Sequence, residues 1–136
     1  MDEARRADVK LWLRKARDDH VVARLVMERR GPSAVGCFLC QQAVEKFFKA
    51  CLVAVEIEPP RVHDLDRLAD LLAAAGHVLE LDRDRISALS QYAVAPRYPG
   101  FPDERADEDL AGLVAFVGEV EAAVVVALGL LDPAFP

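Results

Sequence analysis

The segment from residue 33 to 55, SAVGCFLCQQAVEKFFKACLVAV, constrains the fold of this 136-residue chain more than any other. Its apolar residues recur at three- and four-residue steps, which predicts an amphipathic helix with a broad core-facing stripe. The stripe consists of Cys37, Cys40, Val44, Phe47, Phe48, Cys51, Leu52 and Val55. Because such a stripe has to be covered by other elements, we expect the rest of the chain to pack around this helix.

Polar side chains border the stripe in two rows. Gln41, Glu45 and Lys49 follow one another at four-residue steps, and Gln42 and Lys46 form the second row. Amide, carboxylate and ammonium groups at a core boundary are costly to desolvate unless they pair. Two interpretations stay open: a surface helix with a favourable Glu45–Lys49 pair, or a partly buried polar network that packs a partner or binds a ligand.

Four more helices are expected, over residues 3–30, 65–75 and 82–93 and from about Asp103 onward. Gly31 and Pro32 end the first of them, and Ser33 is a suitable N-cap for the next, so these two helices should be antiparallel neighbours. No stretch predicts a strand convincingly. With 53% apolar residues, the chain is expected to form one domain over residues 1–136. The predicted fold is all-α, an up-down antiparallel four-helix-type bundle of about five helices.

The first helix carries an acidic residue among its apolar ones. Trp12, Ala16, Ala23 and Val26 form the predicted stripe, and Asp19 falls in its middle. A buried carboxylate needs a partner, for which Lys15 or a lysine of the second helix is within reach. An ion pair that locks the two helices together and a ligand-facing role both remain open.

Two further positions combine polar chemistry with a turn. His63 stands just before Asp64, the predicted N-cap of the third helix, where it can contact either a neighbouring helix or a nucleotide or RNA. Arg97 and Tyr98 lie in a proline-rich loop that should be rigid and non-helical. A guanidinium beside a flat ring suits a phosphate and a base, and equally suits a cap over the end of the bundle.

Charge limits the partners that are expected. The net charge of −6 argues against general binding of polyanions, so any contact with nucleic acid should be local. The first thirty residues are the expected place, since they hold nine Lys or Arg against six Asp or Glu.

Motifs exclude several classes of enzyme and metalloprotein. Cys37 and Cys40 form a CxxC pair, but no second pair or nearby His completes a zinc site, so core packing is the expected role of the cysteines. The sequence has no Rossmann or P-loop glycines, no GxSxG and no HExxH. No metal site, cofactor or catalytic residue of these common kinds is predicted.

One long apolar segment, residues 110–131, has the length of either a membrane-spanning helix or a core helix. It contains Glu119 and Glu121, and each charge would cost about 2.5–3.5 kcal/mol at mid-membrane depth. A core helix is therefore expected. With early acidic residues and no signal peptide at the N-terminus, we expect a soluble, cytoplasmic protein without a membrane partner.

Several of these motifs resemble those of a known family. The run CFLCQQAVEKFFKACL is similar to the signature helix of the HEPN domain (higher eukaryotes and prokaryotes nucleotide-binding), in which an aromatic residue, two glutamines and an EKxxK unit recur. Trp12, Ala16 and Asp19 fit its first helix, His63-Asp64-Leu65 its HDL turn, and Arg97-Tyr98-Pro99 its late RYP segment. The resemblance extends over residues 9–131 and implies a helical fold.

For function, the resemblance implies two branches. Some HEPN proteins are metal-independent ribonucleases with an Arg followed four to six residues later by a His, late in the chain. This sequence departs from that pattern, because its histidines stand at positions 20, 63 and 77 only and none follows Arg97. Arg14 does precede His20 by six residues, but in the first helix, and we treat this spacing as chance.

The other branch, which the Gln41–Lys46 and RYP motifs resemble more closely, contains non-catalytic proteins encoded beside a minimal nucleotidyltransferase in toxin–antitoxin-like pairs. It implies a homodimer that binds the nucleotide or the substrate of that partner. The implied ligand set is Asp19, Gln41, Glu45, Lys49, His63, Arg97 and Tyr98. A third possibility is a structural homodimeric interaction module without a ligand.

Overall fold

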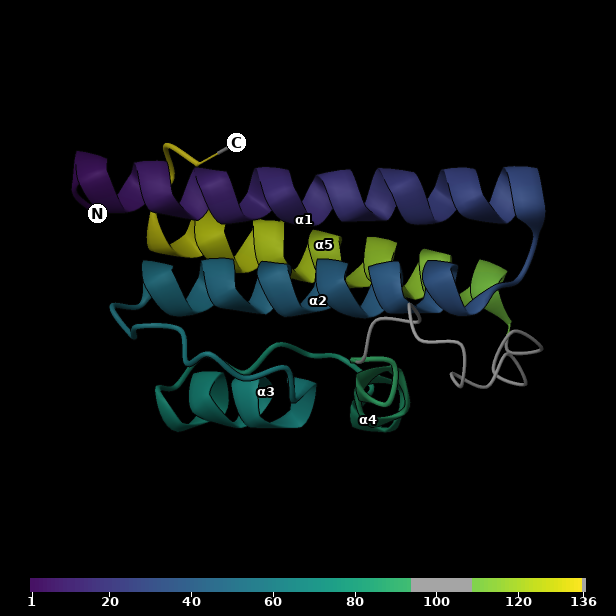
Figure 1. Cartoon of the computed structure of the whole chain (residues 1–136). Coiled ribbons are helices and arrows are strands. Elements are labelled where there is room, and N and C mark those ends of the chain that lie inside the picture. The colour runs from purple at the N-terminus through teal and green to yellow at the C-terminus, as the bar shows by residue number, and fades with distance from the viewer. Residues whose placement is uncertain (94–108, 136) are drawn as a thin grey trace.

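The computed structural model describes residues 1–93 and 109–135. These residues form five helices: α1 (Glu3–Arg30), α2 (Ala34–Ala54), α3 (Leu65–Ala74), α4 (Arg83–Ser90) and α5 (Leu110–Leu131) (Figure 1). No strand occurs within the described ranges, so the predicted all-α class is confirmed.

The turn between α1 and α2 follows its sequence signals. Gly31 adopts φ = 76°, and its backbone N–H donates to the carbonyl of Met27, which closes α1. The Ser33 hydroxyl then accepts from the backbone N–H of Gly36 at 3.2 Å and caps α2. The two helices therefore lie antiparallel and side by side along most of their length (Figure 1).

α5 runs in the same direction as α2 and opposite to α1 (Figure 1). At one end Gly36 faces Leu110 so closely that a Cβ atom at Gly36 would lie 2.5 Å from Leu110 Cδ2. At the other end, Arg6 Nη2 donates to Asp132 Oδ2 at 2.7 Å. The Arg6 guanidinium holds the pKa of this carboxyl below its usual value. A close apolar contact and an ion pair thus fix the two ends of α5 against α2 and α1.

The core forms around α2, as its stripe predicts. Fifteen of its 21 residues are buried, far more than a single face would supply, because α1, α3, α4 and α5 all contact it. Cys37, Cys40 and Cys51 are buried thiols, which confirms that they pack in the core. Burial raises the pKa of Cys40 and of Cys51 to about 12.

α5 has an apolar face that the fold leaves uncovered. It is the one helix within residues 1–93 and 109–135 that is long and apolar enough to cross a membrane, and 28% of its most apolar window is buried. Its buried residues, Val120 and Val124 among them, belong to the common core, whereas Val126 and Leu130 are 64% and 82% exposed. α5 is thus a core helix on one side only.

Two details differ from the sequence-based expectation, and a third is not tested. The buried stripe of α1 consists of Val9, Leu13, Ala16, His20 and Ala23, so it is rotated relative to the predicted one. Trp12, Asp19 and Val26 are half-buried at its edge because the ridge that meets α2 and α5 runs through Leu13 and His20. α4 ends at Ser90 rather than at residue 93, and α5 is described from Leu110, so the expected start near Asp103 lies outside the described residues.

Candidate functional site

The polar row on α2 is enclosed by the fold. Gln41, Glu45 and Lys49 are 0%, 4% and 7% exposed, which contradicts the surface-helix interpretation and supports the partly buried network. The Glu45 carboxylate accepts from Lys49 Nζ at 3.1 Å through Oε2, and from Gln41 Nε2 at 3.3 Å through Oε1. Hydrogen bonds to an ionised carboxylate are stronger than those between neutral groups.

The third partner of Glu45 comes from the turn before α3 rather than from α1. His63 Nδ1 lies 3.0 Å from Glu45 Oε1, and the His63 carbonyl accepts from Gln41 Nε2 at 2.9 Å. Gln42 extends the cluster by donating to Gln41 Oε1 at 2.7 Å. We call Gln41, Gln42, Glu45, Lys49 and His63 the Glu45 network; it ties α2 to the segment that leads into α3.

His63 is the exposed member of the Glu45 network. Its side chain is 64% exposed, whereas that of Glu45 is 5% exposed. The buried carboxylate orients the imidazole through Nδ1, and the ring therefore presents Nε2 to the outside. The network ends at the surface in a polar group of fixed orientation.

Asp19 lies in a second cluster, next to the Glu45 network. Its carboxylate accepts from Lys46 Nζ at 2.5 Å, and both side chains are about one-fifth exposed. Lys46 is one of the partners that the sequence predicted for Asp19, and the ion pair joins α1 to α2. The pair lines a groove of about 460 Å³ formed by Leu11, Trp12, Lys15, Asp18, Asp19 and Lys46. We call it the Trp12 groove.

Lys49 connects the two clusters. Its ammonium group, which pairs with Glu45, also lies 5.8 Å from the centre of the Trp12 ring, within range of a cation–π contact. A continuous series of contacts therefore runs from the Trp12 groove through Lys49 and Glu45 to His63.

Of the seven residues in the predicted ligand set, Gln41, Glu45, Lys49 and His63 come together in one network. Asp19 lies apart from them, in the Trp12 groove. Arg97 and Tyr98 lie outside the described residues.

Sequence reasoning missed three members of the Trp12 groove as possible ligand contacts: Trp12, Lys15 and Asp18. A signal was available, because Trp12, Lys15 and Asp19 are spaced i, i+3 and i+7 and so share one face of a helix. An aromatic ring and an ammonium group on that face, beside the carboxylate, make a candidate binding surface.

The Arg14–His20 spacing places His20 inside a helix interface rather than in an open site. His20 is 6% exposed, and its Nε2 lies 3.0 Å from the carbonyl oxygen of Val114 on α5. Arg17 pairs with Glu121 across the same helix interface at 2.7 Å. His20 is therefore a packing residue between α1 and α5, and Glu121 is half-buried at the edge of this interface.

The described part of the chain contains no group of three or more His, Cys, Asp or Glu side chains arranged to hold a metal ion. The polar chemistry of this region consists of ammonium, carboxylate, amide and imidazole groups that bind one another.

These features define a class of protein: an all-α bundle whose central helix pair encloses a row of paired polar side chains. A family model of the HEPN domain matches residues 9–126, and the chain therefore belongs to the HEPN family. HEPN domains are associated with nucleic acids and often occur in toxin–antitoxin systems. No curated protein and no solved structure matches the chain.

Proposed function

We propose that this HEPN protein binds a nucleotide or a nucleotide unit of nucleic acid without catalysing a reaction, and that the Trp12 groove is the site. The observation that carries the proposal is the composition of the groove: an aromatic ring, two lysines and two aspartates around about 460 Å³. This volume falls within the range of ligand pockets. The Glu45 network is internally paired and contacts the groove through Lys49 and the Trp12 ring.

Each group in the groove matches a part of a nucleotide. The Trp12 ring offers a surface on which a base can stack, a contact worth about 1–3 kcal/mol per base. Lys15 supplies an ammonium group for phosphate, and the exposed Asp18 carboxylate can accept from ribose hydroxyls. Because Lys46 is already paired with Asp19, Lys15 is the main phosphate contact.

Trp12 is the single tryptophan of the chain, so its fluorescence reports on the groove directly. Titration with ATP, GTP and short single-stranded RNA should quench or shift this fluorescence with a saturable curve. Lys15→Gln should weaken binding about tenfold, whereas Lys10→Gln, an exposed lysine of α1 outside the groove, should not. If millimolar nucleotide leaves the fluorescence unchanged, the groove is not the site.

The wider proposal is that the protein works with a minimal nucleotidyltransferase in a toxin–antitoxin-like pair in the cytoplasm. Membership of the HEPN family supports this class of role. Affinity purification of the tagged protein from its source cell should recover a nucleotidyltransferase, and nucleotide should alter the yield. Recovery of the protein alone would contradict the proposed partnership with a nucleotidyltransferase.

We also propose a homodimer formed through the uncovered face of α5. Val126 and Leu130 are strongly exposed there, while the two acids of α5 are paired, Glu119 with Arg85 and Glu121 with Arg17. A two-fold interface places residues beside their own copies, which this face tolerates because its acids are already paired. Light scattering should give a dimer mass, and Leu130→Asp should give a monomer. The same face is also consistent with a purely structural dimeric module. In that case, titration with nucleotide should leave the Trp12 fluorescence unchanged.

A further inference from the structure

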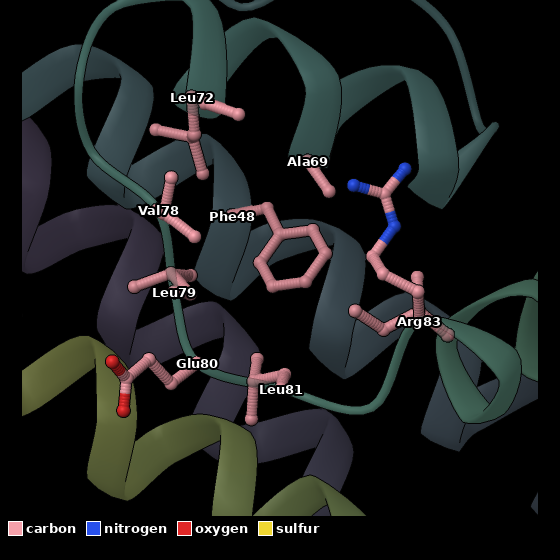
Figure 2. A pocket seen from close by; sticks show the side chains of 10 residues that line it. Phe48, Ala69, Leu72, Val78, Leu79, Glu80, Leu81 and Arg83 are labelled. Carbon is pink, nitrogen blue, oxygen red and sulfur yellow. The ribbon is translucent and has the colours of Figure 1, made fainter.

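A separate cavity lies where α3, α4 and the segment between them meet α2. Its volume is about 380 Å³, within the range of small-molecule pockets. It shares no lining residue with the Trp12 groove. Figure 2 shows the ring of Phe48 from α2 in its centre, with Leu72 and Val78 on one side and Ala69 and Arg83 on the other.

The interior of the cavity is apolar. Its lining is made almost entirely of hydrocarbon side chains, of which Phe48, Leu72 and Ile86 are fully buried at the bottom. Val78 lies at the mouth and is 70% exposed, although it belongs to the same apolar surface. A polar or charged group placed at the bottom would lose its hydration without a compensating hydrogen bond. The body of any ligand therefore has to be apolar.

The mouth of the cavity is held in place by backbone contacts. Gly76 adopts φ = 84°, and the N–H of His77 donates to the carbonyl of Leu72 at 2.9 Å. Further along, the N–H of Leu81 donates to the carbonyl of Leu79 at 2.8 Å, just before α4 begins. Because these bonds fix the segment that forms one wall, the cavity is preformed, which lowers the cost of binding.

The charges at the mouth select the polar group of the ligand. Arg83 is already engaged: its Nη2 lies 2.7 Å from Asp70 Oδ1 and 3.5 Å from Asp66 Oδ1. The hydrogen bond that Arg83 donates to Asp70 raises the pKa of Arg83, which stays charged. An anionic ligand would therefore compete with two carboxylates for one guanidinium.

Glu80 supplies the complementary site for a cation. It lines the cavity, its side chain is exposed, and no ion pair to it is found among residues 1–93 and 109–135. In Figure 2 its carboxylate points away from Phe48, so a partner charge would stay at the rim in contact with water. Glu80 and Arg83 are the charged residues of the lining, and because Arg83 is already paired with Asp66 and Asp70, the charge left for a ligand at the mouth is the Glu80 carboxylate.

We propose that this cavity binds a small molecule with an apolar body and one cationic group, an aliphatic or aromatic amine. The body occupies the space over Phe48, and the ammonium group lies at the rim beside Glu80. This arrangement keeps the charge hydrated while the hydrocarbon is buried, as long basic side chains do at protein surfaces. The site does not depend on nucleotide binding at the Trp12 groove.

Octylamine, octanol and octanoate test the proposal because they share one chain and differ in head-group charge; the two ions are used below their micellar concentrations and octanol below its solubility limit. Titrations are followed by the amide NMR shifts of residues 76–83 and by calorimetry. Octylamine should give saturable shifts confined to this segment and to α3, and octanoate should bind at least tenfold more weakly. Absence of saturable shifts with octylamine, or equal binding of octanoate, overturns the proposal.

Variants separate the contributions of charge and space. Glu80→Gln should weaken octylamine at least threefold and leave octanol unchanged, whereas Glu28→Gln, an exposed acid of α1, should change neither. Ala69→Leu should fill the cavity and weaken all ligands that bind. If that variant fails to fold, Val78→Lys at the exposed rim serves instead and should abolish octylamine binding. Unchanged octylamine affinity in Glu80→Gln and in the cavity variant would refute the assignment.

Discussion

The pairing of Glu45 with Lys49 should make Glu45→Gln strongly destabilising. The two charges lie 3.1 Å apart, and their side chains are 5% and 8% exposed. At an effective dielectric constant of about 20, a pair at this distance attracts by about 5 kcal/mol. Part of this gain offsets desolvation, and removal of one member of a buried pair typically costs about 3–5 kcal/mol. Because glutamine keeps the shape and one acceptor, we expect a loss near the lower limit, about 3 kcal/mol.

Urea unfolding followed by circular dichroism measures this loss, and thermal melting should show a decrease in Tm of about 10 °C. Asp70→Asn is the matched control, since it breaks an ion pair of 2.7 Å whose carboxylate is 70% exposed. The control should cost less than about 1 kcal/mol.

A second substitution tests the mechanism. If the cost comes from an ammonium group left buried without its counter-charge, Lys49→Met in the Glu45→Gln background should restore at least half of the lost stability. Two results would refute the reasoning: a Glu45→Gln loss no larger than that of Asp70→Asn, or a double variant that is simply the sum of the single ones.

Two further predictions concern packing around α2. Gly36→Ala should destabilise by about 1 kcal/mol despite the better helix propensity of alanine, because the new methyl group meets Leu110; the cost should fall in a Leu110→Ala background, as a denaturation cycle would show. Cys40 and Cys51 should resist thiol reagents at pH 8 in the folded protein and react on unfolding, as a colorimetric thiol assay would show. Since burial raises their pKa from 9.0 to about 12, the stability that they contribute is complete below pH 9 and lost as pH rises toward 12, which melting curves across this range would check.

The sequence predicted the parts of this structure that depend on local chemistry. The caps at Gly31 and Ser33 and the burial of the α2 cysteines follow from residue type and period, and the structure confirms them. The spacing of Gln41, Glu45 and Lys49 placed these residues on one edge, although it could not decide between surface and interior.

The parts that depend on distant segments were beyond sequence reasoning. Trp12 misled the prediction for α1, because a large aromatic residue suggests the centre of a core face although this ring lies at its edge. The burial of His20 rests on a carbonyl of Val114, 94 positions away. Likewise, Glu45 meets His63 only because of the path that the chain takes after α2. No periodicity encodes such a path.

The position of Lys49 couples the free energy of binding at the Trp12 groove to that of binding at the exposed imidazole of His63. One ammonium group contacts both the indole ring and the carboxylate that orients His63, so a molecule that displaces the ring also changes the surroundings of that carboxylate. Thermodynamic linkage requires the converse to hold with equal strength. Binding at either surface therefore changes the free energy of binding at the other. The NMR signals of the His63 ring should accordingly report whether the Trp12 groove is occupied.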